Sequence, residues 1–214
     1  MSTAVHPTTG SSSVAQHRAG VSKVHVFARF VGRAEGLCLD LGCGTGALMA
    51  HAGPALRVVG LDLSADFCRE ARAAGEQALC GDLSAGLPFR AARFDWAVCS
   101  DAFEHLVDPL ALVGEIRRVL RPGGRLLCHV PNEFSYKSLR QILRGDGICN
   151  RGFFPGTEEW NYPHLRFFSH RGFKAMLEQG GFEIETDLTD FARGWRRRFY
   201  PLFGSGPSFV ARAA

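Results

Sequence analysis

The stretch Asp40-Leu41-Gly42-Cys43-Gly44-Thr45-Gly46 decides the expected fold. It ends a mostly apolar run at 37–41 and leads into another at 47–52, so it is placed as a turn between a strand and a helix. Glycines let a backbone turn sharply and lie against a ligand, and a helix N-terminus presents N–H groups to it. Taken alone, such a turn is either a ligand-binding loop or merely a tight connection.

Acidic residues follow the next three predicted strands. Asp62 closes the Val-rich strand at 57–61, about twenty residues after the turn, where a carboxylate can accept both hydroxyls of a ribose. Asp82 follows the strand at 77–80, and Ser100-Asp101 ends the strand predicted at 95–99. Each acid alone could be a solvated loop carboxylate. Their succession after a glycine turn favours a cofactor site at the carboxyl edge of a sheet.

Strand and helix patterns alternate along the rest of the chain. Helices are expected at 14–31, 47–52, 65–74, 109–120 and 170–179, and later strands at 125–130, 182–188 and 208–213. This alternation predicts an α/β fold in which crossover helices join parallel strands.

The motifs resemble those of the class I S-adenosylmethionine (SAM)-dependent methyltransferases, in particular the small-molecule group and its ubiquinone-biosynthesis O-methyltransferase type. The resemblance covers about residue 37 to the C-terminus. The motifs that carry it are Leu39 to Gly46, Gly60-Leu61-Asp62, Gly81-Asp82-Leu83, Leu87-Pro88-Phe89, Phe94-Asp95, Glu104-His105-Leu106 and Leu120 to Gly124. It implies a Rossmann-like, seven-stranded, mostly parallel sheet with helices on both faces, whose last strand inserts antiparallel beside the fifth.

The resemblance also implies SAM as cofactor and S-adenosylhomocysteine (SAH) as product. The glycine turn would contact the methionine part, Asp62 the ribose hydroxyls, Asp82 with Leu83 the adenine, and Ser100 the region near the sulfonium. The residues expected to bind the cofactor are Asp40, Gly42, Cys43, Gly44, Gly46, Asp62, Leu63, Asp82, Leu83 and Ser100. An NAD-dependent oxidoreductase is disfavoured because its G-x-G-x-x-G fingerprint is spaced differently.

Two histidines are candidates for the catalytic base. The sulfonium already carries a good leaving group, so the enzyme has to align a nucleophile and, for a hydroxyl acceptor, remove its proton. His105, just after the fourth strand, is the first candidate, and His164, within the stretch 161–169, is the second. Either could instead be a histidine bonded to backbone, and His129 is expected to be packed inside the sheet.

A divalent-metal site is the alternative for the same residues. Asp101, Glu104 and His105 form a D-x-x-E-H cluster, and His164 lies about sixty residues downstream. The pattern resembles the E-x-x-E-H plus distant His of metal-assisted methyltransferases of the ubiquinone-biosynthesis and small-RNA 2′-O-methylating kinds. Asp101 replaces their Glu and shortens one ligand arm, and many relatives carry Glu-His here without a metal.

Two further segments can each be interpreted in more than one way. The stretch 131–163 is rich in aromatic residues and is expected to cover the acceptor pocket, or else to form a small satellite core. The basic run at 193–198 could bind a phosphate, a carboxylate or a membrane surface, or could be a solvated face.

Composition indicates the number of domains and the compartment of the protein. The 214 residues are 46% hydrophobic, which suffices for one domain at 14–214 behind a disordered leader at 1–13. The seven cysteines are odd in number and include no C-x-x-C pair, which favours a reducing compartment. No stretch resembles a secretory signal or a membrane span, so a soluble, cytoplasmic protein is expected. The oligomeric state stays open.

The expected function is SAM-dependent methyl transfer to a small-molecule acceptor, at an oxygen of a biosynthetic intermediate. The net charge of +4 is compatible with an anionic acceptor but low for a dedicated nucleic-acid binder. The alternatives are an RNA 2′-O-methyltransferase and a non-catalytic SAM-binding protein. The first is disfavoured because Ser100-Asp101-Ala102-Phe103 stands where nucleic-acid enzymes carry Asn/Asp-Pro-Pro-Tyr/Trp, and the second because the glycine turn and its acids are intact.

Overall fold

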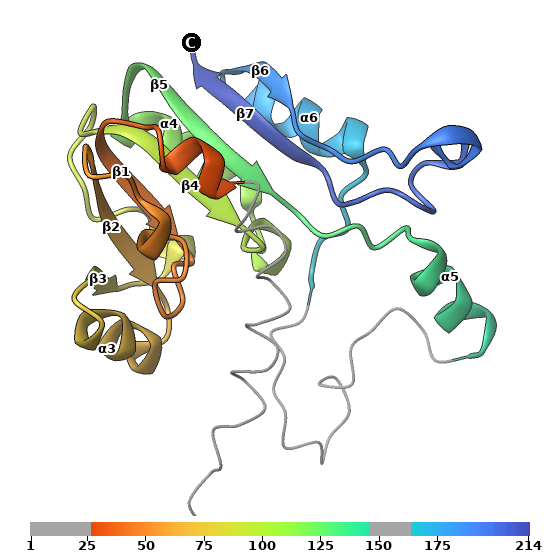
Figure 1. Ribbon diagram of the computed structural model, residues 1–214, viewed down its shortest axis with the longest axis horizontal. Helices are drawn as coiled ribbons and strands as arrows, with labels where there is room; N and C mark the ends of the chain where they lie inside the picture. Colours follow the sequence, from red (N-terminus) through yellow and green to blue (C-terminus); the bar gives the residue numbers. More distant parts are fainter. Residues whose placement is uncertain (1–26, 146–163) are drawn as a thin grey trace, which may run out of the picture.

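A seven-stranded sheet organises the chain in the computed structural model, which describes residues 27–145 and 164–214. The strand order is β3-β2-β1-β4-β5-β7-β6 (Figure 1). The strands are β1 Gly36–Leu41, β2 Leu56–Asp62, β3 Gln77–Cys80, β4 Phe94–Ser100, β5 Leu120–His129, β6 Phe182–Asp187 and β7 Ser208–Ala213. Neighbouring strands among β1 to β5 pair in parallel, whereas β7 lies antiparallel between β5 and β6. The expected mostly parallel sheet with an antiparallel last strand is confirmed.

The helices begin at polar side chains that cap their first N–H groups. They are α3 Ala65–Ala73, α4 Pro109–Val119, α5 Tyr136–Leu143 and α6 His170–Gln179, with the 3₁₀-helices η1 Met49–His51, η2 Leu83–Ala85, η3 Phe103–His105 and η5 Gly194–Phe199. Ser64 accepts from the Phe67 amide, Asp108 from the Ala111 amide and Ser169 from the Gly172 amide. Such caps fix where each helix begins and hence where the preceding loop ends.

The core has two layers because strand side chains alternate between the faces of the sheet. On one face, Leu39 and Cys99 pack with apolar residues of α4 and α6 such as Ile116 and Phe173. On the other, Cys38, Val98, Leu127 and Val210 pack against Phe27 and Val31 of the helical residues 27–31. Figure 1 shows these helices on opposite faces of the sheet. Helices on both faces were expected.

Most predicted elements are observed within one or two residues, but the helix expected at 47–52 is shorter. The observed element is η1, three residues long, after a series of turns. Gly53-Pro54 follows closely, and a proline disfavours helical geometry at the residue before it. The chain therefore has no room there for a full α-helix.

Two other differences concern the start of a strand and an unforeseen helix. Strand β5 begins at Leu120, five residues before the predicted start, and a register shift between Phe94 and Trp96 accommodates the extra pairing. Helix α5 was not predicted. Residues 14–26 of the first expected helix, the expected leader at 1–13, and the part of the aromatic segment at 146–163 lie outside the described residues.

Candidate cofactor and acceptor site

The glycine turn lies at the carboxyl edge of the parallel strands and is fixed to β2 by its backbone. The amides of Gly42 and Cys43 donate to the Leu61 carbonyl at 2.8 and 3.3 Å. Gly42, Gly44 and Gly46 have φ values of 75°, 54° and 87°. This left-handed region is strained for residues with a Cβ, so the turn requires glycine at these places.

Gly60 makes room for the turn on the neighbouring strand. A Cβ added at Gly60 would lie 2.5 Å from the Cys43 Sγ, far inside van der Waals contact. The Cys43 side chain is buried there, and burial raises the pKa of its thiol well above the usual range. Cys43 is therefore a neutral packing residue, not a nucleophile.

The Asp62 carboxylate connects the glycine turn to the start of α3. One of its oxygens accepts from the Gly44 amide at 2.8 Å, and the other accepts from the Ser64 amide at 2.8 Å. A carboxylate has about four lone-pair positions, so acceptor capacity remains on the half-buried Asp62 side chain. Two ribose hydroxyls could use that capacity.

A second acid lies buried at the same place. Burial raises the pKa of Asp40 to about 7, and the neighbouring charge of Asp62 adds to the shift. A positive ligand at the turn would stabilise the ionised form of this carboxyl. The pair of acids therefore fits a cationic cofactor better than a phosphate-bearing one.

The ends of β2 and β3 present apolar and acidic groups side by side. Asp82 accepts from both the amide and the hydroxyl of Ser84, at 2.8 and 2.7 Å, and these bonds lower its pKa. Leu63 is 53% exposed, and its carbonyl accepts from the Cys80 thiol at the end of β3. An exposed leucine beside a carboxylate can contact the face and the amino edge of a purine.

Asp101 links the ends of β4 and β5. Its amide donates to the His129 carbonyl at 3.2 Å, and its carboxylate lies 3.1 Å from the His129 Nδ1. The Ser100 hydroxyl donates to the same carboxylate at 2.9 Å. Asp101 has a φ of 54°, uncommon for a residue with a Cβ, and His129 is fully buried.

Glu104, His105 and His164 form a compact group although His164 lies far along the chain. The Glu104 carbonyl accepts from the Leu165 and Arg166 amides at 2.7 and 3.0 Å, which brings His164 to η3. The rings of His105 and His164 lie 4.9 Å apart. One ligand atom from each of the three residues lies within 4.8 Å of the other two. The fourth metal candidate, Asp101, is not part of this group and contacts His129 instead.

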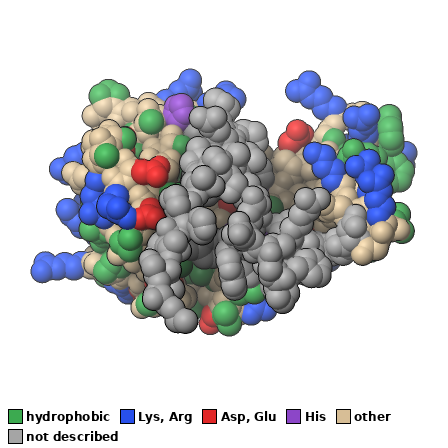
Figure 2. All heavy atoms as spheres, turned by 90° about the horizontal axis from the view of Figure 1, so that it is seen from below, with side chains coloured by type: hydrophobic (Ala, Val, Ile, Leu, Met, Phe, Trp, Pro, Cys, Tyr) green, Lys and Arg blue, Asp and Glu red, His purple; other side chains and the backbone are tan. Residues whose placement is uncertain are grey.

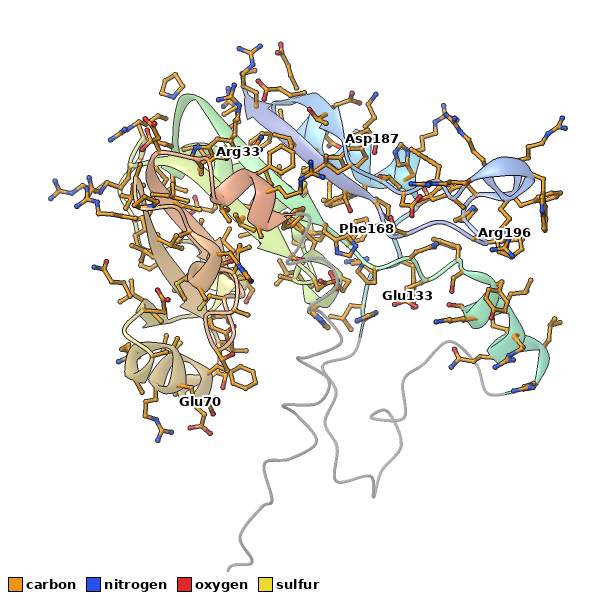
Figure 3. The ribbon with its side chains drawn as sticks, in the orientation of Figure 1. Arg33, Glu70, Glu133, Phe168, Asp187 and Arg196 are labelled. Atoms are coloured by element: carbon orange, nitrogen blue, oxygen red, sulfur yellow. The ribbon has the colours of Figure 1, made fainter. Side chains whose placement is uncertain are left out.

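Glu133 orients His164 and was missed by the sequence analysis. Its carboxylate lies 2.5 Å from the His164 Nδ1. This hydrogen bond is the main reason why the pKa of His164 is raised, with Glu104 adding to the effect and burial opposing it. The available signal was an acid three residues beyond the predicted fifth strand. Figure 3 places Glu133 in the middle of the molecule, between the β1 to β3 half and α5.

The glycine turn and the histidine pair are neighbours. A Cβ added at Gly42 would lie 3.5 Å from the Cβ of Ala102, the residue just before η3. The turn that would hold a cofactor therefore adjoins the element that carries Glu104 and His105.

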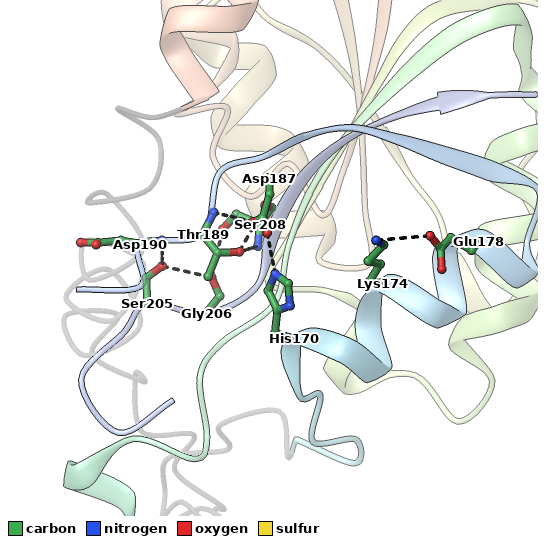
Figure 4. A network of polar contacts seen from close by, with 9 residues as sticks. All are labelled: His170, Lys174, Glu178, Asp187, Thr189, Asp190, Ser205, Gly206 and Ser208. Carbon is green, nitrogen blue, oxygen red and sulfur yellow. Dashed lines mark hydrogen bonds and ion pairs between the residues drawn. The ribbon is translucent and has the colours of Figure 1, made fainter. Parts of the chain in front are cut away.

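A cavity of about 310 Å³ opens farther along the same edge. It is lined by Asn132, Phe134, Phe168, Ser169, His170, Arg171, Tyr200 and Pro201. The His170 Nε2 lies 2.7 Å from the carboxylate of Asp187, which also accepts from the Thr189 amide (Figure 4). Burial is the main reason why the pKa of Tyr200 rises to about 12, so its hydroxyl is neutral. The cavity thus combines aromatic side chains with polar groups, of which His170 is fixed by Asp187.

Comparison with known proteins finds matches to the part of the chain that carries the glycine turn. A family model described as "Methyltransferase domain" matches residues 39–128, which include the glycine turn, β2 to β4 and parts of β1 and β5. These residues therefore match the methyltransferase domain family, and the motifs of the chain resemble those of the class I SAM-dependent methyltransferases. Among relatives of this family, a trans-aconitate 2-methyltransferase from Azoarcus sp. is 39% identical over 51% of this chain and 44% of its own length. A ubiquinone biosynthesis O-methyltransferase from Cereibacter sphaeroides is 32% identical over 59% of this chain and 54% of its own length.

Solved methyltransferase structures share the fold. A SAM-dependent methyltransferase from Thermotoga maritima superposes with a TM-score of 0.64 at 19% identity, covering 94% of this chain and 96% of the other. The chain spans about half the length of the two sequence relatives above. Within residues 27–145 and 164–214, no helix is long and apolar enough to cross a membrane.

Proposed function

We propose that the chain transfers a methyl group from SAM to an oxygen of a small-molecule acceptor. The observation that carries the proposal is the pair of hydrogen bonds from Gly44 and Ser64 to Asp62, next to a histidine pair on the acceptor side. The similarity to an O-methyltransferase of ubiquinone biosynthesis supports an oxygen acceptor. The mildly basic composition supports an acceptor that carries negative charge.

Each part of the cofactor has residues that fit it. The turn at Gly42, Gly44 and Gly46 would bind the methionine part, with the buried Asp40 and Cys43 beneath it. Asp62 would accept the ribose hydroxyls, since its carboxylate keeps acceptor capacity. Leu63, Asp82 and Leu83 would bind the adenine, and Ser100 would line the region near the sulfonium. SAM, when bound, supplies an electrophilic methyl group with a good leaving group.

His164 is the better-placed base of the two histidines. Its Nδ1 is held by Glu133, which fixes the ring and leaves Nε2 to take a proton from an acceptor hydroxyl. Glu133 raises the pKa of His164, which makes the neutral ring a stronger base once it is deprotonated. His105, with its ring 4.9 Å away, would orient the acceptor or share the proton.

The same three side chains support a second arrangement. Glu104, His105 and His164 offer one carboxylate and two imidazoles within 4.8 Å of one another, a donor set that suits a divalent cation. With such an ion, His105 and His164 would be ligands and not bases, so the two arrangements exclude each other. Treatment with EDTA, metal add-back and elemental analysis distinguish them. Activity that is indifferent to chelation, with no bound metal, removes the metal arrangement.

Binding and transfer together test the proposed function. Calorimetry is expected to show SAH binding and no comparable binding of NAD. Methyl transfer from radiolabelled SAM is then compared for phenolic, carboxylate and RNA acceptors. His105→Ala and His164→Ala should lower the single-turnover rate about 100-fold or more with SAH binding retained. The exposed His51→Ala is the matched control. NAD binding in preference to SAH, or a preference for RNA, would contradict the proposal.

A further inference from the structure

Helix α5 and the segment around η5 form one surface with many exposed apolar side chains, here named the α5–η5 surface. The Tyr136 amide donates to the Leu202 carbonyl at 2.9 Å, and the rings of Tyr136 and Phe203 lie 6.1 Å apart, so the two elements are in contact. The exposed apolar residues are Tyr136 (47%), Leu139 (44%), Ile142 (45%), Leu143 (78%), Trp195 (63%), Phe199 (50%) and Phe203 (36%). Such a concentration marks an interaction surface, whereas single exposed apolar residues are ordinary.

Positive charge surrounds these apolar residues. The stretches 134–145 and 191–204 contain no Asp or Glu, and they contain Lys137, Arg140, Arg144, Arg193, Arg196, Arg197 and Arg198. All seven cations are exposed, and none forms an ion pair with another residue in the part of the chain that the structure describes. The Arg196 guanidinium lies 5.7 Å from both the Trp195 and the Phe203 rings. Figure 2 shows basic and hydrophobic side chains gathered at the end of the molecule where α5 and η5 lie.

We propose that the α5–η5 surface docks on an anionic lipid bilayer. A short helix with leucine and isoleucine beside Lys and Arg matches segments that lie in the interface plane, with apolar side chains among the acyl chains and cations among the headgroups. Tyrosine and tryptophan side chains such as Tyr136 and Trp195 favour the headgroup level. An anionic nucleic acid would also attract the arginines, but it would leave the aliphatic side chains of Leu139, Ile142 and Leu143 in water. The aliphatic side chains therefore favour a lipid bilayer over a nucleic acid as the partner.

This inference is independent of methyl transfer, because its test measures binding to vesicles. The full chain is sedimented with vesicles of phosphatidylcholine alone and with vesicles that also contain phosphatidylglycerol. Binding to the anionic vesicles is expected, with weaker binding to the neutral ones and a decrease as salt is raised. A chain that stays in the supernatant with anionic vesicles at low salt refutes the proposal, as does preferential binding to single-stranded RNA in a parallel titration.

Charge and apolar variants locate the contact. Changing Arg196, Arg197 and Arg198 together to glutamine should weaken binding by roughly 100-fold, since each basic residue near an anionic surface contributes about fivefold. The matched control changes Arg33, Arg57 and Arg90, exposed arginines outside the α5–η5 surface, and should keep most of the affinity. Equal losses in the two triple variants would show only a net-charge effect and would overturn the assignment of the surface.

The apolar part has its own pair of variants. Ile142→Glu should weaken vesicle binding by about tenfold or more, because a charge replaces a side chain that enters the acyl region. Leu79→Glu on β3 is the control, since Leu79 is 46% exposed and Ile142 45%. Circular dichroism confirms that each variant is folded before binding is measured. If Ile142→Glu binds anionic vesicles as the unaltered chain does, the docking proposal is wrong.

Discussion

Replacing Asp62 by alanine is expected to weaken SAH binding by about 100-fold. The ribose would lose a carboxylate acceptor for two hydroxyls, and hydrogen bonds to a charged group contribute about 1.5 kcal/mol each, or about 3 kcal/mol together. The turn itself also loses support, because the Gly44 and Ser64 amides both donate to this carboxylate at 2.8 Å. The free energy of unfolding of the ligand-free chain should therefore fall by about 2 kcal/mol.

Two further variants make this prediction specific. Asp62→Asn keeps one oxygen but presents an NH₂ group to an amide donor, so about tenfold weaker binding is expected. Asp66→Ala removes an exposed acid on α3 whose partner is Arg69, and its affinity should stay within about twofold of the unaltered chain. Isothermal titration with SAH measures affinity, and urea denaturation measures stability. An unchanged dissociation constant in a folded Asp62→Ala protein would refute the assignment of Asp62 to the ribose.

Three other changes test the geometry around the turn and the base. Gly60→Ala should lower SAH affinity at least about tenfold, because the added Cβ would overlap the Cys43 Sγ. Adding Cys43→Ala should restore part of that loss. Equal affinities for the single and double variants would show that the overlap is not the cause. Glu133→Gln should move the rising limb of the pH–rate profile to lower pH, since the Glu133 hydrogen bond raises the pKa of His164. If this limb does not move, another group is responsible for the pH dependence. Asp40 has a raised pKa of about 7 against an ordinary 3.8, so its ionisation opposes folding and stability declines as pH rises from about 4 to 7. Asp40→Asn should reduce this decline, as measured by urea denaturation at pH 5 and pH 8, and an identical pH dependence in both proteins would contradict it.

The glycine turn and its acids could be predicted because their signals are local. Gly42, Gly44 and Gly46 are required by positive φ values, and a run of glycines in a sequence shows that requirement directly. Asp62 follows a Val-rich strand, and parallel strands bring their carboxyl ends to one edge of a sheet. The antiparallel last strand beside the fifth followed from the resemblance to a known family. The glycine turn and Asp62, by contrast, depend on residues that are neighbours in the sequence.

The neighbourhood of the candidate base was predicted only in part. Both His105 and His164 were predicted as candidates. Their rings lie 4.9 Å apart because the Leu165 and Arg166 amides donate to the Glu104 carbonyl. Backbone hydrogen bonds of this kind do not require particular side chains, so the sequence does not reveal them. Glu133 was missed for the same reason, since an acid after a strand has many ordinary uses.

The sequence by itself determined the class of fold, the glycine turn and the acids at the strand ends. Periodicity and backbone strain are properties of short segments, so they can be recognised without knowing what packs against them. Only the tertiary structure decided that Asp101 joins His129, that His164 is held by Glu133, and that α5 lies against the segment before β7. These contacts join residues from about thirty to seventy positions apart. Their partners are chosen by the packing of the whole sheet and its connections, which no local pattern encodes.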